Sequence, residues 1–380
     1  MNRLKNERNL FFEGGKYVIN EIMTSSPVFF MGASSGAGFY SCFDDIYDAD
    51  RGDRAFILKG GPGTGKSTLM KHIAQSLCKK GEMCEFGICS SDPESLDVVR
   101  FEKSSVVICD GTSPHTMDPK YPGVCENIVA LGDFFDINKL KENGDEIIAL
   151  TKVNSALHKK AGRYLAAAAS LAQDSYSIAC SAADSDAINA FSLRLTQALI
   201  PEAAESDEPP RQVRRLLSAV TSKGHIFLKN TLGVMCDRVV LIEDEYGVVS
   251  SAVMNSVVSA AYQNGYDTVI CPCPLCPAKK IDHVIIPELR LGFSTTNRYL
   301  TAGEHCGRIT HARRFIDTEA LKKYRQRLSF NKRAMLELLD GAYLSMKDAK
   351  SIHDDIEFYY TSAMDFSKVE QLEKRILSQI

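Results

Sequence analysis

The chain has 380 residues, enough for about two domains, and its 44% hydrophobic and 24% charged residues are typical of a globular protein. A formal net charge of −3 provides no basic field of the kind that nucleic-acid-binding domains carry. No apolar run approaches the roughly 18 residues of a membrane span, and no apolar core of a secretory signal follows residues 1–8. The twelve cysteines are scattered and mostly lie in apolar runs, so we expect reduced thiols in a cytoplasmic protein with neither membrane nor nucleic acid as partner.

An apolar run at residues 28–31 predicts the first strand. The small-residue stretch after it, residues 32–38, predicts a loop that contains Gly32, Gly36 and Gly38. Two interpretations of this loop stay open. It is either a plain turn or a second contact to the phosphate or base of a ligand.

The strongest motif lies at residues 60–68, which match the phosphate-binding pattern G-x-x-x-x-G-K-[ST]. Its members are Gly60, Gly61, Pro62, Gly63, Thr64, Gly65, Lys66, Ser67 and Thr68. Residues 55–58 predict a strand before the motif, and apolar residues at helical spacing in residues 68–77 predict a helix after it. Glycines let such a loop turn its N–H groups inward, and the helix directs the positive end of its dipole at bound phosphate. We therefore expect Lys66 to reach the β- and γ-phosphates of a nucleoside triphosphate and the Ser67 hydroxyl to ligate Mg²⁺.

Two further apolar runs, residues 84–89 and residues 105–110, predict two more strands. The second run ends in Asp110, which is typical of the aspartate that holds Mg²⁺ opposite the serine of a phosphate loop. We therefore expect Ser67 and Asp110 to be the metal-binding residues.

The predicted catalytic residues are Lys66 and Asp110 together with Asp92 and His115. Both follow predicted strands, and the carboxyl ends of parallel strands gather at the ligand crevice. Either side chain is therefore a candidate for contact with a γ-phosphate. The alternatives are that Asp92 only begins a turn before Pro93 and that His115 is an ordinary loop histidine.

Apolar residues at three- and four-residue steps predict a long helical hairpin at about residues 137–199. The acidic, proline-containing stretch at residues 201–210 predicts a linker. We therefore predict two domains, residues 1–205 and residues 206–380. The second would close with a helical tail at about residues 317–380.

The second half of the chain repeats landmarks of the first. Arg238 lies 184 residues after Arg54, and each opens an apolar run. Other matched pairs are Cys89 and Cys273, Asp97 and Asp282, Gly38 and Gly224, and Asp136 and Asp317. These pairs predict an α/β fold of two repeated parallel-sheet units, each followed by a helical appendage. Chance similarity between two short α/β segments is the alternative.

The spacing of 184 residues places the second phosphate loop at residues 244–251. In that alignment Ser250 replaces Lys66, Val249 replaces Gly65, and Asp244 and Glu245 replace the first two glycines. A β-branched residue resists the positive φ that glycine supplies, and carboxylates repel phosphate. We therefore expect one competent nucleotide site and one relic.

Three cysteines of the second half, Cys271, Cys273 and Cys276, suggest a metal site because Cys273 and Cys276 have the spacing of a zinc knuckle. No second C-x-x-C pair follows, although His283, His305, Cys306 and His311 lie further along the chain. Free thiols at the end of a strand are the favoured interpretation.

With these motifs the chain resembles a little-characterised bacterial family of tandem P-loop ATPases. The segments that carry the resemblance are KGGPGTGKST at residues 59–68, SSDPESLD at residues 90–97, DGTSPH at residues 110–115 and IDHVIIPEL at residues 281–289. The resemblance covers about residues 28–375, and it implies the P-loop NTPase fold and ATP binding without supplying a cellular role. The second half of such proteins can also keep a phosphate loop, and this chain departs from the family there.

The expected function is that of a slow, Mg²⁺-dependent ATPase with one nucleotide site in the first half. Many ATPases place a glutamate directly after the metal-binding aspartate, but Gly111 follows Asp110 here. Two alternatives stay open: a small-molecule kinase in which Asp92 activates the acceptor, and a non-hydrolysing switch that orders a surface for a protein partner. ATP and Mg²⁺ are the expected cofactors, and the acceptor or partner is not identified by the sequence.

Overall fold

The computed structural model describes residues 19, 21–114, 116–204, 208–298, 300–301 and 309–380. Its contacts divide the chain into two compact units. Of the described residues, unit 1 takes in those up to Met31, those of Phe43–Ala156 and those of Asp348–Ile380, and unit 2 takes in those of Gly32–Cys42 and Leu157–Lys347. Among the described helices, none combines the length and the apolar content that a membrane span requires.

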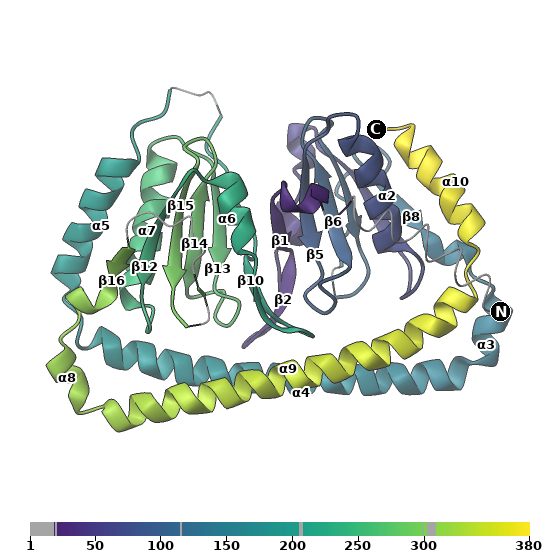
Figure 1. Cartoon of the computed structure of the whole chain (residues 1–380). Helices are drawn as coiled ribbons and strands as arrows, with labels where there is room; N and C mark the ends of the chain where they lie inside the picture. The colour runs from purple at the N-terminus through teal and green to yellow at the C-terminus, as the bar shows by residue number, and fades with distance from the viewer. Residues whose placement is uncertain (1–18, 20, 115, 205–207, 299, 302–308) are drawn as a thin grey trace. The chain divides into compact units, whose positions relative to one another are not determined.

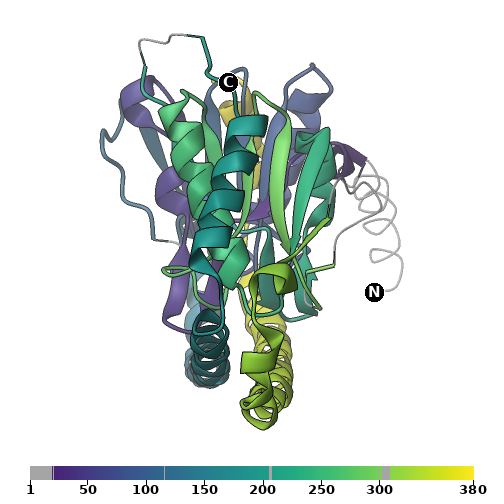
Figure 2. The same ribbon diagram turned by 90° about the vertical axis from the view of Figure 1, so that its left-hand side faces the viewer.

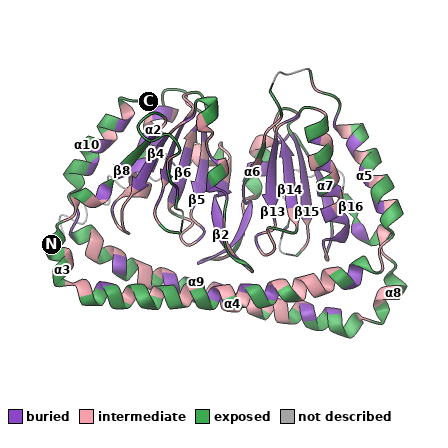
Figure 3. Ribbon diagram, turned by 180° about the vertical axis from the view of Figure 1, so that it is seen from behind, coloured by how far each residue is buried: buried purple, intermediate pink, exposed green. Residues whose placement is uncertain are grey.

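Unit 1 is built on a six-stranded sheet with the order β1-β5-β6-β7-β4-β8 (Figure 1). Its strands are β1 (Val28–Phe30), β4 (Arg54–Lys59), β5 (Cys84–Ile88), β6 (Leu96–Phe101), β7 (Val106–Asp110) and β8 (Glu126–Ala130). Neighbouring strands are parallel except in the two pairs that β6 forms. The middles of β4 and β7 are continuous apolar runs whose residues are buried, which is the pattern of strands covered on both faces (Figure 3).

Unit 2 contains a second six-stranded sheet, of order β16-β12-β15-β14-β13-β9. Its strands are β9 (Gln212–Arg214), β12 (Arg238–Glu243), β13 (Thr268–Pro272), β14 (Ile281–Ile286), β15 (Leu291–Thr296) and β16 (Ile309–His311). Taken from β9 to β16, the strands of this sheet correspond one by one to the strands of unit 1 from β1 to β8. The antiparallel strand is β14, which corresponds to β6 in the first sheet. The expected α/β class is therefore confirmed, but each sheet is mixed and not wholly parallel.

Unit 2 also contains two short antiparallel hairpins. In unit 2 the hairpins are β2 (Gly32–Ser35) with β3 (Gly38–Ser41), and β10 (Ser218–Thr221) with β11 (Gly224–Phe227). Residues 32–38, predicted as a loop, are thus mostly paired strand. The two turns are closed in the same way, because Ser35 Oγ donates to Gly38 O at 2.7 Å and Thr221 Oγ1 donates to Gly224 O at 2.8 Å.

The helices repeat in the same order. The first series is α2 (Lys66–Cys78), α3 (Ile137–Glu142), α4 (Gly144–Cys180) and α5 (Ser185–Leu199), and the second is α7 (Val248–Gln263), α8 (Thr318–Lys322), α9 (Arg325–Ser362) and α10 (Phe366–Leu377). A further helix is α6 (Lys229–Met235), and the short 3-10 turns include η3 (Leu131–Phe134) and η4 (Ala312–Phe315). Asp136 and Asp317 cap α3 and α8, and Asp184 and Asp365 cap α5 and α10, each through its side chain.

The long helices explain why the units differ from the predicted domains at residues 1–205 and 206–380. The first part of α4 belongs to unit 1 and the rest to unit 2, whereas α9 begins in unit 2 and ends in unit 1. As a result α5 packs on α7 of unit 2, as Figure 2 shows, and α10 packs on α2 of unit 1. Each half of the sequence therefore supplies the closing helix of the other half's sheet.

Candidate functional site

The predicted phosphate loop of unit 1 connects the end of β4 to the start of α2. Gly63 and Gly65 have φ angles of 69° and 86°, in the left-handed region that favours glycine. α2 begins at Lys66, directly after Gly65. No atom of the described residues accepts a hydrogen bond from the N–H groups of Gly63, Gly65 and Lys66. The loop therefore presents free backbone donors at the positive end of a 13-residue helix.

Lys66 lies within the loop that precedes it. Its Nζ donates to the carbonyl oxygens of Gly60 at 2.7 Å and Gly61 at 2.8 Å. The same Nζ lies 3.5 Å from a carboxylate oxygen of Asp110, and both side chains are mostly buried. The structure thus brings together Lys66 and Asp110, which the sequence placed on separate elements.

The two predicted metal ligands keep coordinating capacity. Ser67 Oγ accepts a hydrogen bond from the Leu96 N–H at 2.9 Å, and a hydroxyl has a second lone pair. Asp110 accepts hydrogen bonds from the N–H of Thr112 at 2.8 Å and from the Thr112 hydroxyl, and a carboxylate has about four lone-pair sites. A hydroxyl and a carboxylate are the hard oxygen ligands that Mg²⁺ prefers, so these residues fit the metal.

Asp97, on β6, is a residue to which the sequence assigned no role. It is buried, and its electrostatic neighbours include Asp110, Lys66 and Asp92. Burial, with a further contribution from the negative charge of Asp110, raises the pKa of Asp97 well above its usual range. In the sequence this residue was marked only by its match with Asp282 in the second half and by its place at the end of the SSDPESLD segment.

Asp92 lies in the turn between β5 and β6. Its carboxylate accepts hydrogen bonds from the Glu94 N–H at 3.3 Å and the Ser95 hydroxyl at 2.9 Å, and it lies 3.4 Å from Lys350 Nζ. The local geometry of Asp92 is therefore that of a turn, which is one of the two interpretations offered by the sequence. Its ion pair with Lys350 was not predicted. His115 lies outside the described residues.

Residues near the end of α9 contact the phosphate loop within unit 1. A Cβ built on Gly63 would lie 2.8 Å from the carbonyl oxygen of Glu357 and 2.5 Å from Thr361 Oγ1, and one on Gly61 would lie 3.2 Å from the Tyr360 ring. The glycines are therefore required for close approach as well as for conformation. Sequence reasoning missed these contacts because Thr361 and Gly63 are 298 residues apart and carry no shared motif.

The counterpart loop of unit 2 corrects the alignment made from the sequence. α7 begins after Gly247, whose φ of 83° and ψ of 10° match the 86° and 11° of Gly65. Gly247 is therefore the counterpart of Gly65, and Val248 is the counterpart of Lys66, in place of the predicted Val249 and Ser250. The predicted alignment was wrong because the loop after β12 is two residues shorter than the loop after β4.

Asp244 occupies the N-terminus of α7 with its own carboxylate. It accepts hydrogen bonds from the N–H groups of Tyr246 at 3.1 Å, Gly247 at 2.9 Å and Ser250 at 2.9 Å, and it is 1% exposed. The sequence predicts that Asp244 repels phosphate from this loop. The hydrogen bonds give a stronger reason, since the donors that would bind an anion already bind Asp244.

Cys271, Cys273 and Cys276 lie at or just after the end of β13. Burial raises the pKa of Cys273 to about 12 and also raises the pKa of Cys276, which keeps both thiols protonated. Among the residues that the structure describes, no three His, Cys, Asp or Glu side chains gather as a metal site would require. His305 and Cys306 of the zinc hypothesis lie outside those residues.

Comparison with known proteins gives one family match. The family model of the nephrocystin 3 N-terminal region matches residues 40–107, a stretch that runs from before β4 through the phosphate loop and α2 into β7. Neither the curated proteins nor the solved structures contain a match to this chain.

Proposed function

We propose that the protein is a P-loop NTPase that binds one ATP with Mg²⁺ at residues 60–68 and hydrolyses it slowly in the cytoplasm. The observation that carries this proposal is the contrast between the two loops. In unit 1 the N–H groups of Gly63, Gly65 and Lys66 have no protein acceptor among the described residues, and Lys66 lies beside Asp110. In unit 2 Asp244 accepts a hydrogen bond from the N–H of Gly247, the counterpart of Gly65. One site per chain follows from that contrast.

Each residue has a defined task in this proposal. Lys66 exchanges its bonds to the carbonyls of Gly60 and Gly61 for phosphate oxygens, which restores the charge-assisted hydrogen bonds of its ammonium group. Ser67 and Asp110 would hold Mg²⁺, which supplies positive charge against the charge that develops on the phosphates. Lys350, close to Asp92, adds a further cation from α9.

Slow turnover is supported by the packing after Asp110. A Cβ on Gly111 would lie 2.4 Å from Ile57 Cγ2, and the Gly111 carbonyl accepts a hydrogen bond from Lys59 Nζ at 2.6 Å. The position at which many ATPases carry a glutamate therefore has no room for a side chain. A kinase that uses Asp92 is the weaker candidate, since that carboxylate is held by Ser95 and Lys350.

Isothermal calorimetry with ATP and Mg²⁺ tests the proposal. We expect one nucleotide per chain, with Lys66→Ala weakening binding at least about tenfold because a charge-assisted hydrogen bond contributes about 1.5–3 kcal/mol. Lys80→Ala, an exposed lysine just after α2, is the matched control and should bind as the natural chain does. Two nucleotides per chain, or equal affinity of Lys66→Ala and the natural chain, would contradict the proposal.

A further inference from the structure

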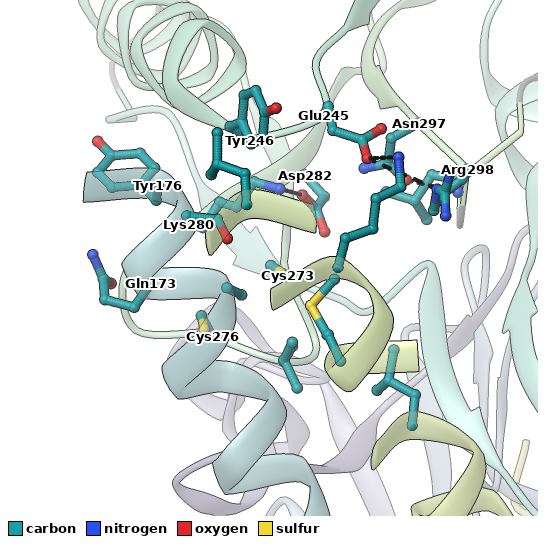
Figure 4. Close-up of a pocket in the computed structure, with 18 of the residues that line it drawn as sticks. Gln173, Tyr176, Glu245, Tyr246, Cys273, Cys276, Lys280, Asp282, Asn297 and Arg298 are labelled. Atoms are coloured by element: carbon teal, nitrogen blue, oxygen red, sulfur yellow. Dashed lines mark hydrogen bonds and ion pairs between the residues drawn. The ribbon is translucent and has the colours of Figure 1, made fainter. Parts of the chain in front are cut away.

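Unit 2 contains a cavity of about 790 Å³ at the carboxyl ends of β12, β13 and β15 (Figure 4). Small-molecule sites in proteins typically measure about 300–1,000 Å³ and lie at that end of a sheet. The loops after the three strands contribute Tyr246, Cys273 and Asn297, and α4 contributes Tyr176 from the facing side. The cavity thus has the size and the place of a ligand site, in the unit whose phosphate loop is blocked.

Much of the cavity wall is apolar. Its hydrophobic members include Leu165, Leu275, Leu300, Leu328, Met335 and Leu339. Leu328, Met335 and Leu339 belong to α9, and their spacing places them on one face of that helix. A wall of this kind excludes water from the apolar part of a bound molecule. Transfer of that part from water into the cavity is therefore favourable.

The charged groups of the wall are predominantly positive, in a chain whose net charge is −3. Its cations are Lys279, Lys280, Arg298, Lys322, Arg325 and Lys332. Its carboxylates are Glu245 and Asp282 alone among the described lining residues. Clefts lined by one sign of charge attract ligands of the opposite sign.

Both carboxylates are already paired. Glu245 lies 2.7 Å from Lys332 Nζ and 3.8 Å from Arg298 Nε, so one carboxylate serves two cations. Asp282 lies 2.8 Å from Lys280 Nζ. Burial alone would lower the pKa of Lys280, but the charge and hydrogen bond of Asp282, together with the negative charge of Asp244 and neighbouring groups, outweigh it and raise the pKa, so the pair is ionic. The wall therefore keeps an excess of positive charge that its own acids do not neutralise.

The blocked loop beside the cavity excludes binding through a phosphate cradle. The Asp244 carboxylate accepts hydrogen bonds from the N–H groups at the start of α7. Lys280 closes over the same loop, since a Cβ on Gly247 would lie 2.7 Å from its Cε and 3.1 Å from its Nζ. An anion in this cavity is consequently held by side chains, chiefly those of α9 and of the loop after β15.

We propose that the cavity of unit 2 is a binding site for a small organic anion with an apolar body, a ligand distinct from the nucleotide of unit 1. Arg325 and Lys332 are seven residues apart, which places them on the face of α9 that carries Leu328 and Met335. They hold the acidic group, whether carboxylate, phosphate or sulfonate, together with Arg298. The leucines and Met335 enclose the apolar body.

Two matched fluorescent probes test this site in the full chain. Anilinonaphthalene sulfonate has an acidic group on an apolar body, and N-phenylnaphthylamine is the same body without the acid. We expect each to bind one molecule per chain with enhanced fluorescence. Replacing both cations, Arg325→Gln with Lys332→Gln, should weaken the sulfonate at least about tenfold and leave the uncharged probe within about twofold, because only the sulfonate loses charge-assisted contacts.

Two further variants make the result specific. Arg333→Gln removes the same charge from an exposed neighbour of Lys332 that does not line the cavity, so both probes should bind it as they bind the natural chain. Ala172→Trp places a large ring in the cavity from α4 and should abolish binding of both probes. The proposal is overturned if the natural chain does not bind the sulfonate, if the double variant binds it unchanged, or if Ala172→Trp leaves binding intact.

Discussion

Asp244 shows how a single residue can replace a ligand. Three backbone N–H groups at the start of α7 converge on its carboxylate, in the arrangement by which helix N-termini bind phosphate. The hydrogen bonds are charge-assisted and buried, which makes them stronger than those between neutral groups. The duplicated loop thus keeps its conformation at Gly247 with no need of an external anion.

Removal of that carboxylate should be costly. In Asp244→Ala the buried N–H groups lose their acceptor, and we expect a loss of about 2–3 kcal/mol in the free energy of unfolding, measured by urea denaturation. Added inorganic phosphate should return part of this stability to the variant and not to the natural chain, because the exposed donors form an anion site. Glu202→Ala, at an exposed carboxylate of unit 2, is the control. Equal stability of Asp244→Ala and the natural chain would refute this role.

At the scale of elements, β14 and β15 are joined across the sheet by a buried histidine. His283 and Ser294 are paired in register, and His283 Nδ1 lies 2.8 Å from Ser294 Oγ. The imidazole is stacked on Phe227 with ring centroids 5.0 Å apart. Burial lowers the pKa of His283 to about 4 from an ordinary value of 6.5. The ring is therefore neutral in the folded chain at any pH above that value.

This lowered pKa predicts a pH-dependent stability. As pH falls below about 6.5 the unfolded chain binds a proton at this histidine that the folded chain does not, so stability is lost down to about pH 4. At about pH 5 the loss from this residue amounts to about 2 kcal/mol relative to neutral pH. His283→Gln should lose correspondingly less stability between about pH 7.5 and pH 5 in urea unfolding. His225, whose pKa is also lowered by burial, remains in both chains and cancels from the comparison. An identical loss in the two chains would rule out the assignment.

Some of the strands and helices could be predicted from the sequence, and others could not. Long apolar runs and a phosphate motif between a strand and a helix identified β4, β7 and α2, because those signals are local. β6 was missed, since Asp97 and Arg100 interrupt its apolar pattern. The sequence also did not show that the loop before Gly247 is two residues shorter than its counterpart. The match of Gly247 with Gly65 is seen in their backbone angles and not in a residue pattern. The contacts of Glu357 with Gly63 have no local signal at all.

At the scale of the whole molecule, each half of the sequence completes the sheet unit of the other. α10 buries Val369, Leu372 and Ile376 in unit 1, where it packs on α2. Burying one such side chain contributes about 1.5–3 kcal/mol, and a domain is stable by only about 5–15 kcal/mol. The loss of α10 is thus comparable to the whole net stability of a domain. The end of α9, which contacts the phosphate loop, would be lost with it.

Separate expression of residues 1–205 and 206–380 tests this exchange. We expect that neither fragment alone gives a cooperative thermal unfolding transition by circular dichroism, and that residues 1–205 alone do not bind ATP, because α10 and the end of α9 are absent. Expressed together, the fragments should co-elute in size-exclusion chromatography and recover ATP binding. A protease site inserted between residues 205 and 206 is the control, since cleavage after folding should leave both properties unchanged. If residues 1–205 alone bind ATP as tightly as the full chain, the exchange of helices has no part in forming the nucleotide site, and the boundary expected from the sequence marks an independent domain.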